Sequence, residues 1–436
     1  MTAPLRVDRG PDGWLCLQTI RRSCLSLAVV AAVGACGHGE RWKRTEVPNS
    51  VAEEIQGRRA VTTIGEVDTL KPTTDFRLPD SLSSLYTLSR PIMVAVGDAP
   101  SCLVALGDIG DRAVHVFQSN GNYAFSFFGG ARVRPEFGAS MLSSLASGRA
   151  DEFVVSTVGG RVVAFGGAGQ RAWAGQLQPA RAANDSGAGN QVVLGPDGLL
   201  YDAWFSGNGP LVRREQWAND RALVRVFDRT GRMIRRIGKV SEYPGEGLTY
   251  FLNRGYVQIF ADTLWFARKA DARILAFPLK GPYDAPARIL ELPVYYRADA
   301  PIEDVSSDGS RVAVRIQEHL RGFTVAPSGE FYVVQNLSWP DMASRSTPWV
   351  PRNVITVVRR DGTVDRRVGV DGRILALAAT PYGFVGSVVI GGRLAALGFT
   401  VNGLKPGANE VSCGRAVEQK GAAASAASEI NFAGSR

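Results

Sequence analysis

Histidine is scarce in this sequence, and that scarcity limits the chemistry expected of the chain. Among 436 residues the three histidines are His38, His115 and His319, which lie far apart in the sequence. A zinc lyase or hydrolase needs several imidazole side chains that converge on one metal ion. No Gly-x-Ser-x-Gly elbow, phosphate loop or dinucleotide fingerprint is present either. The sequence therefore predicts no bound metal and no cofactor.

The chain also lacks a block of like charges. Its formal net charge is +9, a mild excess for its length, and the basic residues are spread along the sequence. Proteins that bind nucleic acid usually gather their positive charge into a patch or stripe. We therefore expect a solvated basic surface with some attraction to anionic polymers, and no binding to nucleic acid.

No hydrophobic run is long enough to cross a membrane. The apolar residues 24–35 follow the basic pair Arg21 and Arg22 and end in small residues. This run is about half of the roughly 20 residues that a spanning helix needs. The order of basic, apolar and then small residues is typical of a signal peptide, so residues 1–35 are predicted to be removed on export.

The end of this segment contains a candidate lipidation site. Residues 33–36 (Val-Gly-Ala-Cys) resemble a bacterial lipobox, in which small residues give a peptidase access and the cysteine receives a lipid. The resemblance implies that Cys36 becomes the first mature residue and anchors the chain through its acyl chains, palmitate among them. Gly37 replaces the Asp that retains such lipoproteins in the inner membrane, which favours the outer membrane, on its periplasmic or surface face. An ordinary secretory signal cleaved near Ala35 is the alternative, and either Sec or twin-arginine export is compatible with Arg21 and Arg22.

Removal of the signal would leave two cysteines that could pair. Cys102 lies in a strand pattern and Cys413 in a tail, and a disulfide bond between them is chemically allowed in an oxidising compartment. The sequence leaves open whether the bond forms. The five cysteines show no spacing typical of metal ligands.

A repeat of four β-rich runs recurs from about residue 91 onward. Turns such as Asn120-Gly121 and Asp361-Gly362 separate some of the runs, and they are strong signals of β-hairpins because these residues tolerate positive φ. The clear copies span residues 92–128, 191–238 and 323–368, and weaker copies span residues 153–175, 256–279 and 374–401. Six units of four strands predict an all-β fold, a six-bladed β-propeller.

Short motifs within the repeats resemble NHL-like blades. The resemblance rests on residues 108–112 before 114–117, on residues 226–238, and on residues 128–130 followed by 135–137. It covers roughly residues 90–402. The resemblance implies a six-bladed architecture and says little about activity.

The ring of blades needs a strand from the other end of the chain to close it. Residues 61–70 are predicted to join the last blade in this role, with a free linker as the alternative. A tether over residues 36–60 is predicted to precede the propeller of residues 61–405. Residues 406–436 are rich in Ala, Ser and Gly and are predicted to be disordered, because they cannot bury enough apolar surface.

Loop lengths distinguish the two ends of the predicted ring. Because strands alternate in direction, the connections from strand 2 to strand 3 and from blade to blade share one end, and the hairpins share the other. The hairpins are short. The long connections all belong to the first set: residues 130–144, 176–190, 206–220, 239–253, 292–321 and 336–352. Long loops in a compact fold are usually functional, so this loop-rich end is the candidate binding surface.

Aromatic and arginine side chains gather in these long loops. Such side chains favour desolvated contacts, because they supply area and forked donors at modest entropic cost. The predicted ligand-binding residues are Arg213, Arg214, Trp217, Trp339, Arg345, Trp349 and Arg352, accompanied by Arg132, Arg134, Tyr295 and Tyr296.

Together these features predict a monomeric, membrane-anchored envelope lipoprotein. Its propeller would bind or scaffold an unknown protein, glycan or anionic polymer through the loop-rich end. One alternative is a subunit of an outer-membrane assembly complex. Another is a metal-dependent hydrolase or lyase at the central channel mouth, for which carboxylates could hold calcium. Because no clear ligand set stands out, a binding role is favoured over catalysis; the candidate carboxylates are Asp108, Asp111, Asp202, Asp262 and Asp271.

Overall fold

The computed structural model consists mainly of β-strands. It describes residues 42–46, 48, 53, 60–64, 67–77, 91–97, 101–108, 112–128, 142–148, 151–157, 160–177, 191–203, 221–306, 312–337, 353–381, 383–390 and 393–401. The helix α4 (Glu246–Leu252) is short. Within the described residues no helix is long and apolar enough to cross a bilayer.

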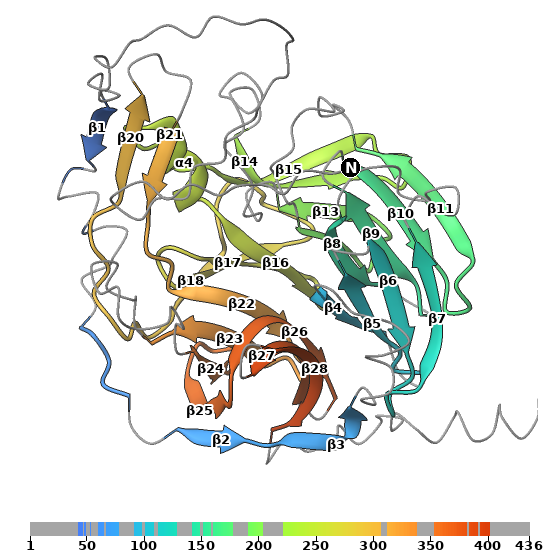
Figure 1. Cartoon of the computed structure of the whole chain (residues 1–436). Helices are drawn as coiled ribbons and strands as arrows, with labels where there is room; N and C mark the ends of the chain where they lie inside the picture. The colour runs from blue at the N-terminus through green and yellow to red at the C-terminus, as the bar shows by residue number, and fades with distance from the viewer. Residues whose placement is uncertain are drawn as a thin grey trace, which may run out of the picture.

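Six antiparallel sheets of four strands are arranged in a ring (Figure 1), which confirms the predicted six-bladed β-propeller. Blade 1 contains β4 (Pro91–Val96), β5 (Val104–Asp108), β6 (Ala113–Phe117) and β7 (Tyr123–Phe128), and blade 2 contains β8 (Leu142–Ser147), β9 (Phe153–Thr157), β10 (Arg161–Phe165) and β11 (Arg171–Gln176). Blade 3 contains β12 (Gln191–Leu194), β13 (Leu200–Ala203), β14 (Ala222–Phe227) and β15 (Met233–Lys239), and blade 4 contains β16 (Gly255–Phe260), β17 (Thr263–Arg268), β18 (Arg273–Pro278) and β19 (Arg288–Glu291).

The last two blades complete the ring. Blade 5 contains β22 (Leu320–Val325), β23 (Phe331–Asn336), β24 (Asn353–Val358) and β25 (Val364–Val370), and blade 6 contains β26 (Arg373–Thr380), β27 (Gly383–Ile390) and β28 (Arg393–Thr400). The first strand of each blade is innermost. These inner strands contact one another in chain order, and β26 returns to contact β4.

Apolar side chains on the middle strands hold neighbouring blades together. The strands β5, β6 and β9 are buried along their whole length, as expected for sheets that are covered on both faces. Phe127 of blade 1 stacks on Phe165 of blade 2, with ring centroids 3.9 Å apart. Trp265 of blade 4 packs on Phe331 of blade 5 at 4.7 Å. Each blade therefore completes the core of the next.

The predicted hairpin turns form at one end of the ring. Gly121 and Gly362 have φ values of 86° and 91°, which glycine adopts without steric cost. The amide of Gly362 donates a hydrogen bond of 2.9 Å to the carbonyl of Arg359. The carboxylate of Asp361 accepts one of 2.9 Å from the amide of Thr363. We refer to this side of the ring as the hairpin end.

An N-terminal strand closes the ring, as predicted, but it is not the predicted segment. The strand β3 (Pro72–Arg77) pairs with β28 as the fourth strand of blade 6. Residues 61–70 instead supply β2 (Asp68–Leu70), which pairs in parallel with β25 and adds a fifth strand to blade 5. Val61 makes an isolated bridge to Val294. The segment before the first blade thus binds two blades rather than one.

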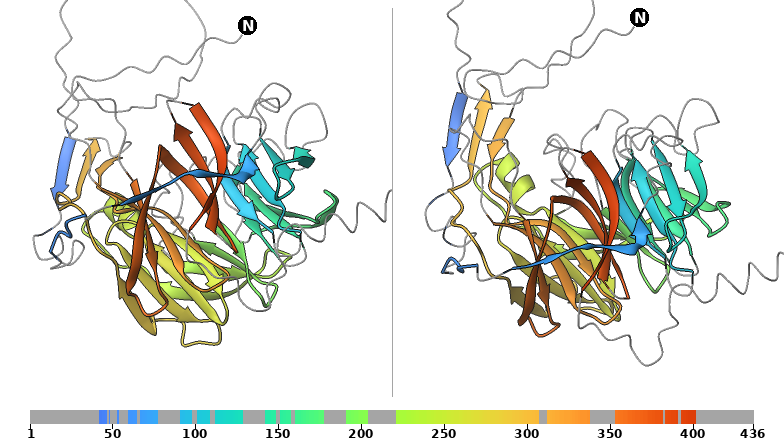
Figure 2. Two further views of the ribbon diagram at one scale, coloured as in Figure 1. Left: turned by 90° about the horizontal axis from the view of Figure 1, so that it is seen from below. Right: turned by 60° about the horizontal axis from the view of Figure 1, so that its bottom comes forward.

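A small sheet outside the ring was not predicted. The strand β1 (Trp42–Glu46), within the segment expected to be a tether, pairs with β20 (Ile302–Ser306). β20 pairs in turn with β21 (Val312–Arg315), and both belong to the connection between blades 4 and 5. Figure 2 shows this sheet standing beyond the ring near α4.

Cys102 lies on the hairpin between β4 and β5 and is 3% exposed. It is disulfide-bonded. The other four cysteines lie outside the described residues, so its pairing with Cys413 stays a prediction.

Candidate functional site

The loop-rich end carries the structural additions of the ring. The helix α4 belongs to the connection from blade 3 to blade 4, and the strands β20 and β21 belong to the next connection. The predicted site residues Arg213, Arg214, Trp217, Trp339, Arg345, Trp349 and Arg352 all lie outside the described residues, as do Arg132, Arg134 and Cys36. Those assignments stay predictions. The described part of this end contains other charged groups that form a candidate site.

A group of charged side chains lies where the inner strands of blades 4, 5 and 6 begin. Arg254 directly precedes β16, and Lys269 follows β17 at the same end of blade 4. Glu318 precedes β22, and Arg321 lies on this strand. Arg373 is the first residue of β26. We call these five residues the inner cluster.

Burial makes the inner cluster unusual. Arg254, Lys269 and Glu318 are 4%, 3% and 8% exposed, whereas Arg321 and Arg373 are half-buried. Burial of a charged side chain costs several kcal/mol unless other groups compensate for the lost water. Arg254 Nη1 lies 3.5 Å from Glu318 Oε1 and provides part of that compensation. The charges of Arg254, Lys269 and Arg321 act on the Glu318 carboxylate, and the charge of Arg321 acts on Arg373.

Lys269 lies at the centre of this arrangement. Its Nζ lies 4.5 Å from the centre of the Tyr256 ring, close enough for a cation–π interaction. Burial lowers the pKa of Lys269 to about 7; the charge of Arg254 acts in the same direction, and the charge of Glu318 opposes it. The ammonium is therefore balanced between its charged and neutral forms near neutral pH.

Burial and neighbouring charges also shift the pKa values of Glu318 and Arg373. Burial by itself would raise the pKa of Glu318, but the positive charges of Arg254 and Lys269 hold it below its ordinary value. Burial and the nearby charge of Arg321 lower the pKa of Arg373. Like charges held together in a partly buried place are a frequent property of sites that bind an oppositely charged group.

Hydrogen bonds fix the backbone beneath the inner cluster. Tyr296 Oη donates to the Glu318 carbonyl at 2.8 Å, and Asn336 Nδ2 donates to the same oxygen at 2.6 Å. The amide of His319 donates to the Lys269 carbonyl at 2.8 Å. Tyr296 also packs against the His319 ring, with centroids 4.6 Å apart. These contacts therefore fix the backbone from which the charged side chains extend.

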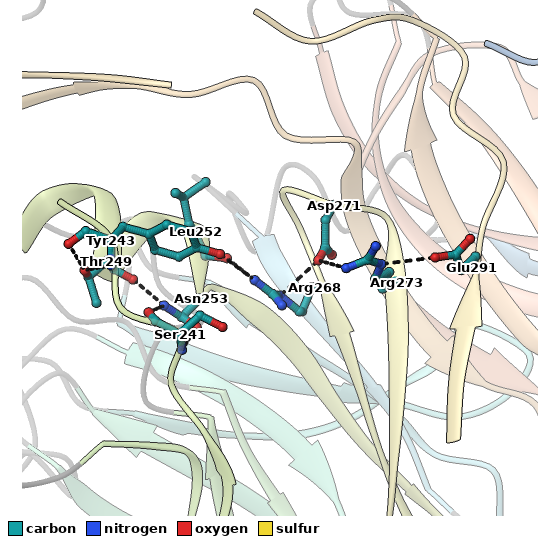
Figure 3. A network of polar contacts seen from close by, with 9 residues as sticks. All are labelled: Ser241, Tyr243, Thr249, Leu252, Asn253, Arg268, Asp271, Arg273 and Glu291. Carbon is teal, nitrogen blue, oxygen red and sulfur yellow. Dashed lines mark hydrogen bonds and ion pairs between the residues drawn. The ribbon is translucent and has the colours of Figure 1, made fainter. Parts of the chain in front are cut away.

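A second polar network runs across blade 4 at the same end (Figure 3). Arg268 Nε lies 3.3 Å from Asp271 Oδ2, and Arg273 Nη1 lies 3.7 Å from the same oxygen. Arg273 also pairs with Glu291 at 3.4 Å, and Arg268 donates to Tyr243 Oη at 3.2 Å. This network ties the inserted segment before α4 to the outer edge of the blade. This network contains two arginines and two carboxylates, whereas the inner cluster contains four basic residues and one carboxylate.

The residues considered as metal ligands are dispersed. Asp202 pairs with Arg225 inside blade 3, and Asp271 belongs to the network across blade 4. Asp108 lies on β5, Asp262 lies on the hairpin between β16 and β17, and Asp111 is outside the described residues. Within the described ranges no three His, Cys, Asp or Glu side chains gather as a metal site requires.

The histidines occupy structural positions. His115 is 3% exposed on β6, and its Nδ1 lies 2.8 Å from the hydroxyl of Ser126. His319 is 3% exposed beneath the inner cluster. His38 lies outside the described residues.

A hollow of about 430 Å³ opens at the hairpin end, at the seam between blades 4 and 5. Trp265 and Pro278 supply apolar lining, and Arg288 and Arg360 supply the charged groups. Both arginines have partners, because Arg288 donates to the Asp361 carbonyl at 2.6 Å and Arg360 lies 4.8 Å from the Phe260 ring centre. The hollow therefore lacks the excess of buried charge seen at the loop-rich end.

The sequence predicted the loop-rich end as the binding surface, which stays a prediction, and it did not predict the inner cluster. Arg254, Lys269 and Arg373 lie beside strands rather than in the longest loops, and their separation in sequence hides their proximity. The sequence contained one signal for these residues, because each of them lies next to the end of a predicted strand on the loop-rich side.

The comparisons with known proteins do not assign the chain to a family. No family model matches the sequence, and no curated protein matches it. The chain is similar to regucalcin, a calcium-binding protein of Agrobacterium tumefaciens, with a TM-score of 0.44 and 13% identity over 78% of this chain and 97% of that chain. It is similar to virginiamycin B lyase of Staphylococcus aureus, with a TM-score of 0.41 and 9% identity over 71% and 94%. It is also similar to BamB of Moraxella catarrhalis, with a TM-score of 0.36 and 14% identity over 71% and 85%. Likenesses at this level carry no argument about this chain.

Proposed function

We propose that this protein is a lipid-anchored envelope lipoprotein with NHL-like blades, and that its propeller binds an anionic ligand at the loop-rich end. The lipid would be attached to Cys36, and the outer membrane is the favoured location. The ligand is a carboxylate or phosphate group of a larger molecule. A β-propeller is compatible with many functions, so the proposal depends on the site rather than on the fold.

The inner cluster is the observation that carries the proposal. It contains three arginines and a lysine from three consecutive blades, in which Arg254, Lys269 and Arg321 lie near the buried carboxylate of Glu318 and Arg373 lies near Arg321. An anion bound there would reduce the repulsion between Arg321 and Arg373, which are half-buried and can still be reached. Arginine is well suited to this role, because its planar fork binds carboxylate or phosphate through two parallel hydrogen bonds.

The disulfide bond at Cys102 supports the proposed compartment. Stable disulfide bonds form in secreted and periplasmic proteins and are rare in the reducing cytosol. Export through the segment of residues 1–35 would bring the chain into such a compartment. The balanced network of Figure 3 fits a supporting role, because its charges are paired with one another.

Titration of the purified full chain with tripolyphosphate tests the proposed ligand class. We expect binding that weakens with added salt, and a Kd at least tenfold higher in Arg321→Gln and Arg373→Gln, since loss of one charge-assisted hydrogen bond costs about 1.5–3 kcal/mol. Arg171→Gln is the matched control, because Arg171 is exposed on the outer strand of blade 2. Equal Kd values in all three variants, or no binding by the parent chain, would contradict the proposal.

A further inference from the structure

The sheet of β1, β20 and β21 connects the N-terminal segment to the loop-rich end. β1 runs antiparallel to β20, with Trp42 opposite Ser306 and Glu46 opposite Ile302. β20 leaves the ring at Ile302, and β21 returns to it at Arg315, so the tip of this hairpin lies at the far end of both strands. Trp42 is therefore at the tip of the sheet farthest from the blades. Figure 2 shows that β1 begins at the end of this sheet that lies away from the ring.

The sheet is firmly attached to the propeller. Leu248 and Leu252 of α4 are fully buried, and the side chains of Val314 and Ile316 pack against them. The amide of Leu248 donates a hydrogen bond of 2.9 Å to the carboxylate of Glu303, which is 4% exposed on β20. Apolar packing and a buried hydrogen bond thus hold the sheet to the helix in the connection before blade 4. The direction of the sheet is therefore fixed relative to the ring.

Chain length then limits where the anchor can be. Six peptide units separate Cys36 from Trp42, and a fully extended chain of that length spans about 20 Å. To bring the hairpin end to the bilayer, the same link would have to pass β1 and a blade strand, which measure about 16 Å and 20 Å. The link is too short for that path.

We infer that the loop-rich end of the propeller faces the bilayer in which the Cys36 lipid is inserted. The inference rests on the lipid anchor of the proposed function. The occupant of this surface is the bilayer itself, and charge supports the assignment: Lys43 is exposed on β1, and basic side chains are attracted to anionic headgroups. The neighbouring Arg44 is paired with Asp304 of the same sheet at 3.2 Å. The inner cluster then lies on the membrane side of the molecule.

Energy transfer in vesicles tests this orientation. The full lipidated chain is reconstituted in phosphatidylglycerol-containing vesicles whose headgroups carry an acceptor dye. A donor dye is placed by Lys43→Cys on β1 or by Lys280→Cys at the hairpin end; both parent side chains are exposed lysines. We expect at least twofold greater transfer from position 43, whereas equal transfer or greater transfer from position 280 would overturn the inference.

A second arm separates this inference from its premise. Cys36→Ser should fail to pellet with the vesicles, while the lipidated chain pellets. If both chains pellet equally, the anchor in the proposed function is wrong, and the orientation fails with it. If only the lipidated chain pellets, the dye measurement decides the orientation independently.

Discussion

The two ends of the propeller are built by different means. At the hairpin end, short turns are fixed by backbone hydrogen bonds and by glycines such as Gly231, which has a φ of 91°. At the loop-rich end, buried ion pairs, a helix and an added sheet cover the ends of the inner strands. The contrast indicates that the hairpin end satisfies the geometry of the fold, whereas the loop-rich end contains groups that the fold does not require. Within the described part of the chain, the buried pair of Arg254 and Glu318 lies at the loop-rich end, and buried charge with shifted pKa values is frequent at functional sites.

Replacement of Glu318 is expected to have the largest effect on stability, and it tests the buried charges at the loop-rich end. Glu318→Gln keeps the shape of the side chain but leaves Arg254 and Lys269 buried without the carboxylate of the inner cluster. We expect a loss of about 3–5 kcal/mol in the free energy of unfolding, as for other broken buried pairs. Denaturant unfolding followed by circular dichroism measures this change.

The matched control uses a carboxylate at the same end. Glu291 pairs with Arg273 at 3.4 Å, but its side chain is 53% exposed. Glu291→Gln should cost less than about 1 kcal/mol, because solvent screens exposed pairs. Similar losses in the two variants would show that the inner cluster contributes no special buried electrostatics.

Replacement of Gly231 tests the hairpin end. A Cβ at this position would lie 1.9 Å from the carbonyl oxygen of Gln176 in the neighbouring blade, and the positive φ adds strain. Gly231→Ala should therefore cost about 3 kcal/mol, within the range expected for severe steric conflicts. Gly198→Ala is the control, because its φ is 76° but the nearest atom would lie 3.9 Å away; it should cost about 1–2 kcal/mol. If both glycines tolerate alanine equally, tight packing between blades 2 and 3 is not the cause.

The smallest expected effect on the loop-rich end is the dependence of its stability on pH through Lys269. The folded protein releases the Lys269 proton near pH 7, whereas the unfolded chain keeps it until about pH 10.5. The unfolded state thus binds more protons between these values, so this group makes stability rise with pH, by at most about 1.4 kcal/mol per pH unit. The pKa of Glu318 is held below its ordinary value, so its carboxylate stays charged in this window. Unfolding curves at pH 7 and pH 9 should show the parent chain gaining stability relative to Lys269→Met, and a constant difference would contradict the assignment.

The blades could be predicted because their signals are local. Turns such as Asn120-Gly121 and Asp361-Gly362 require only neighbouring residues, and the buried runs beside them form the expected strands. The closing strand was assigned wrongly because outer strands are half exposed and carry a weak pattern. Residues 61–70 alternate more regularly than Pro72–Arg77, yet the latter closes blade 6, with proline tolerated at the start of an edge strand.

The inner cluster and the added sheet could not be predicted because their causes are distant in sequence. Arg254 and Glu318 pair across 64 positions, and β1 pairs with β20 across more than 250. A single sequence contains no local pattern that links either residue or strand to its distant partner. Loop length alone nevertheless predicted which end of the ring would carry the additional structure.

The pairing of β1 with β20 also determines how tension on the anchor reaches the protein. Hydrogen bonds between antiparallel strands lie across the strand direction. A pull on the N-terminus away from the ring runs along β1, so it loads the five pairs from Trp42 to Glu46 together in shear instead of opening them one after another. With a lipid at Cys36, thermal motion of the bilayer would act on a junction loaded in its stronger direction.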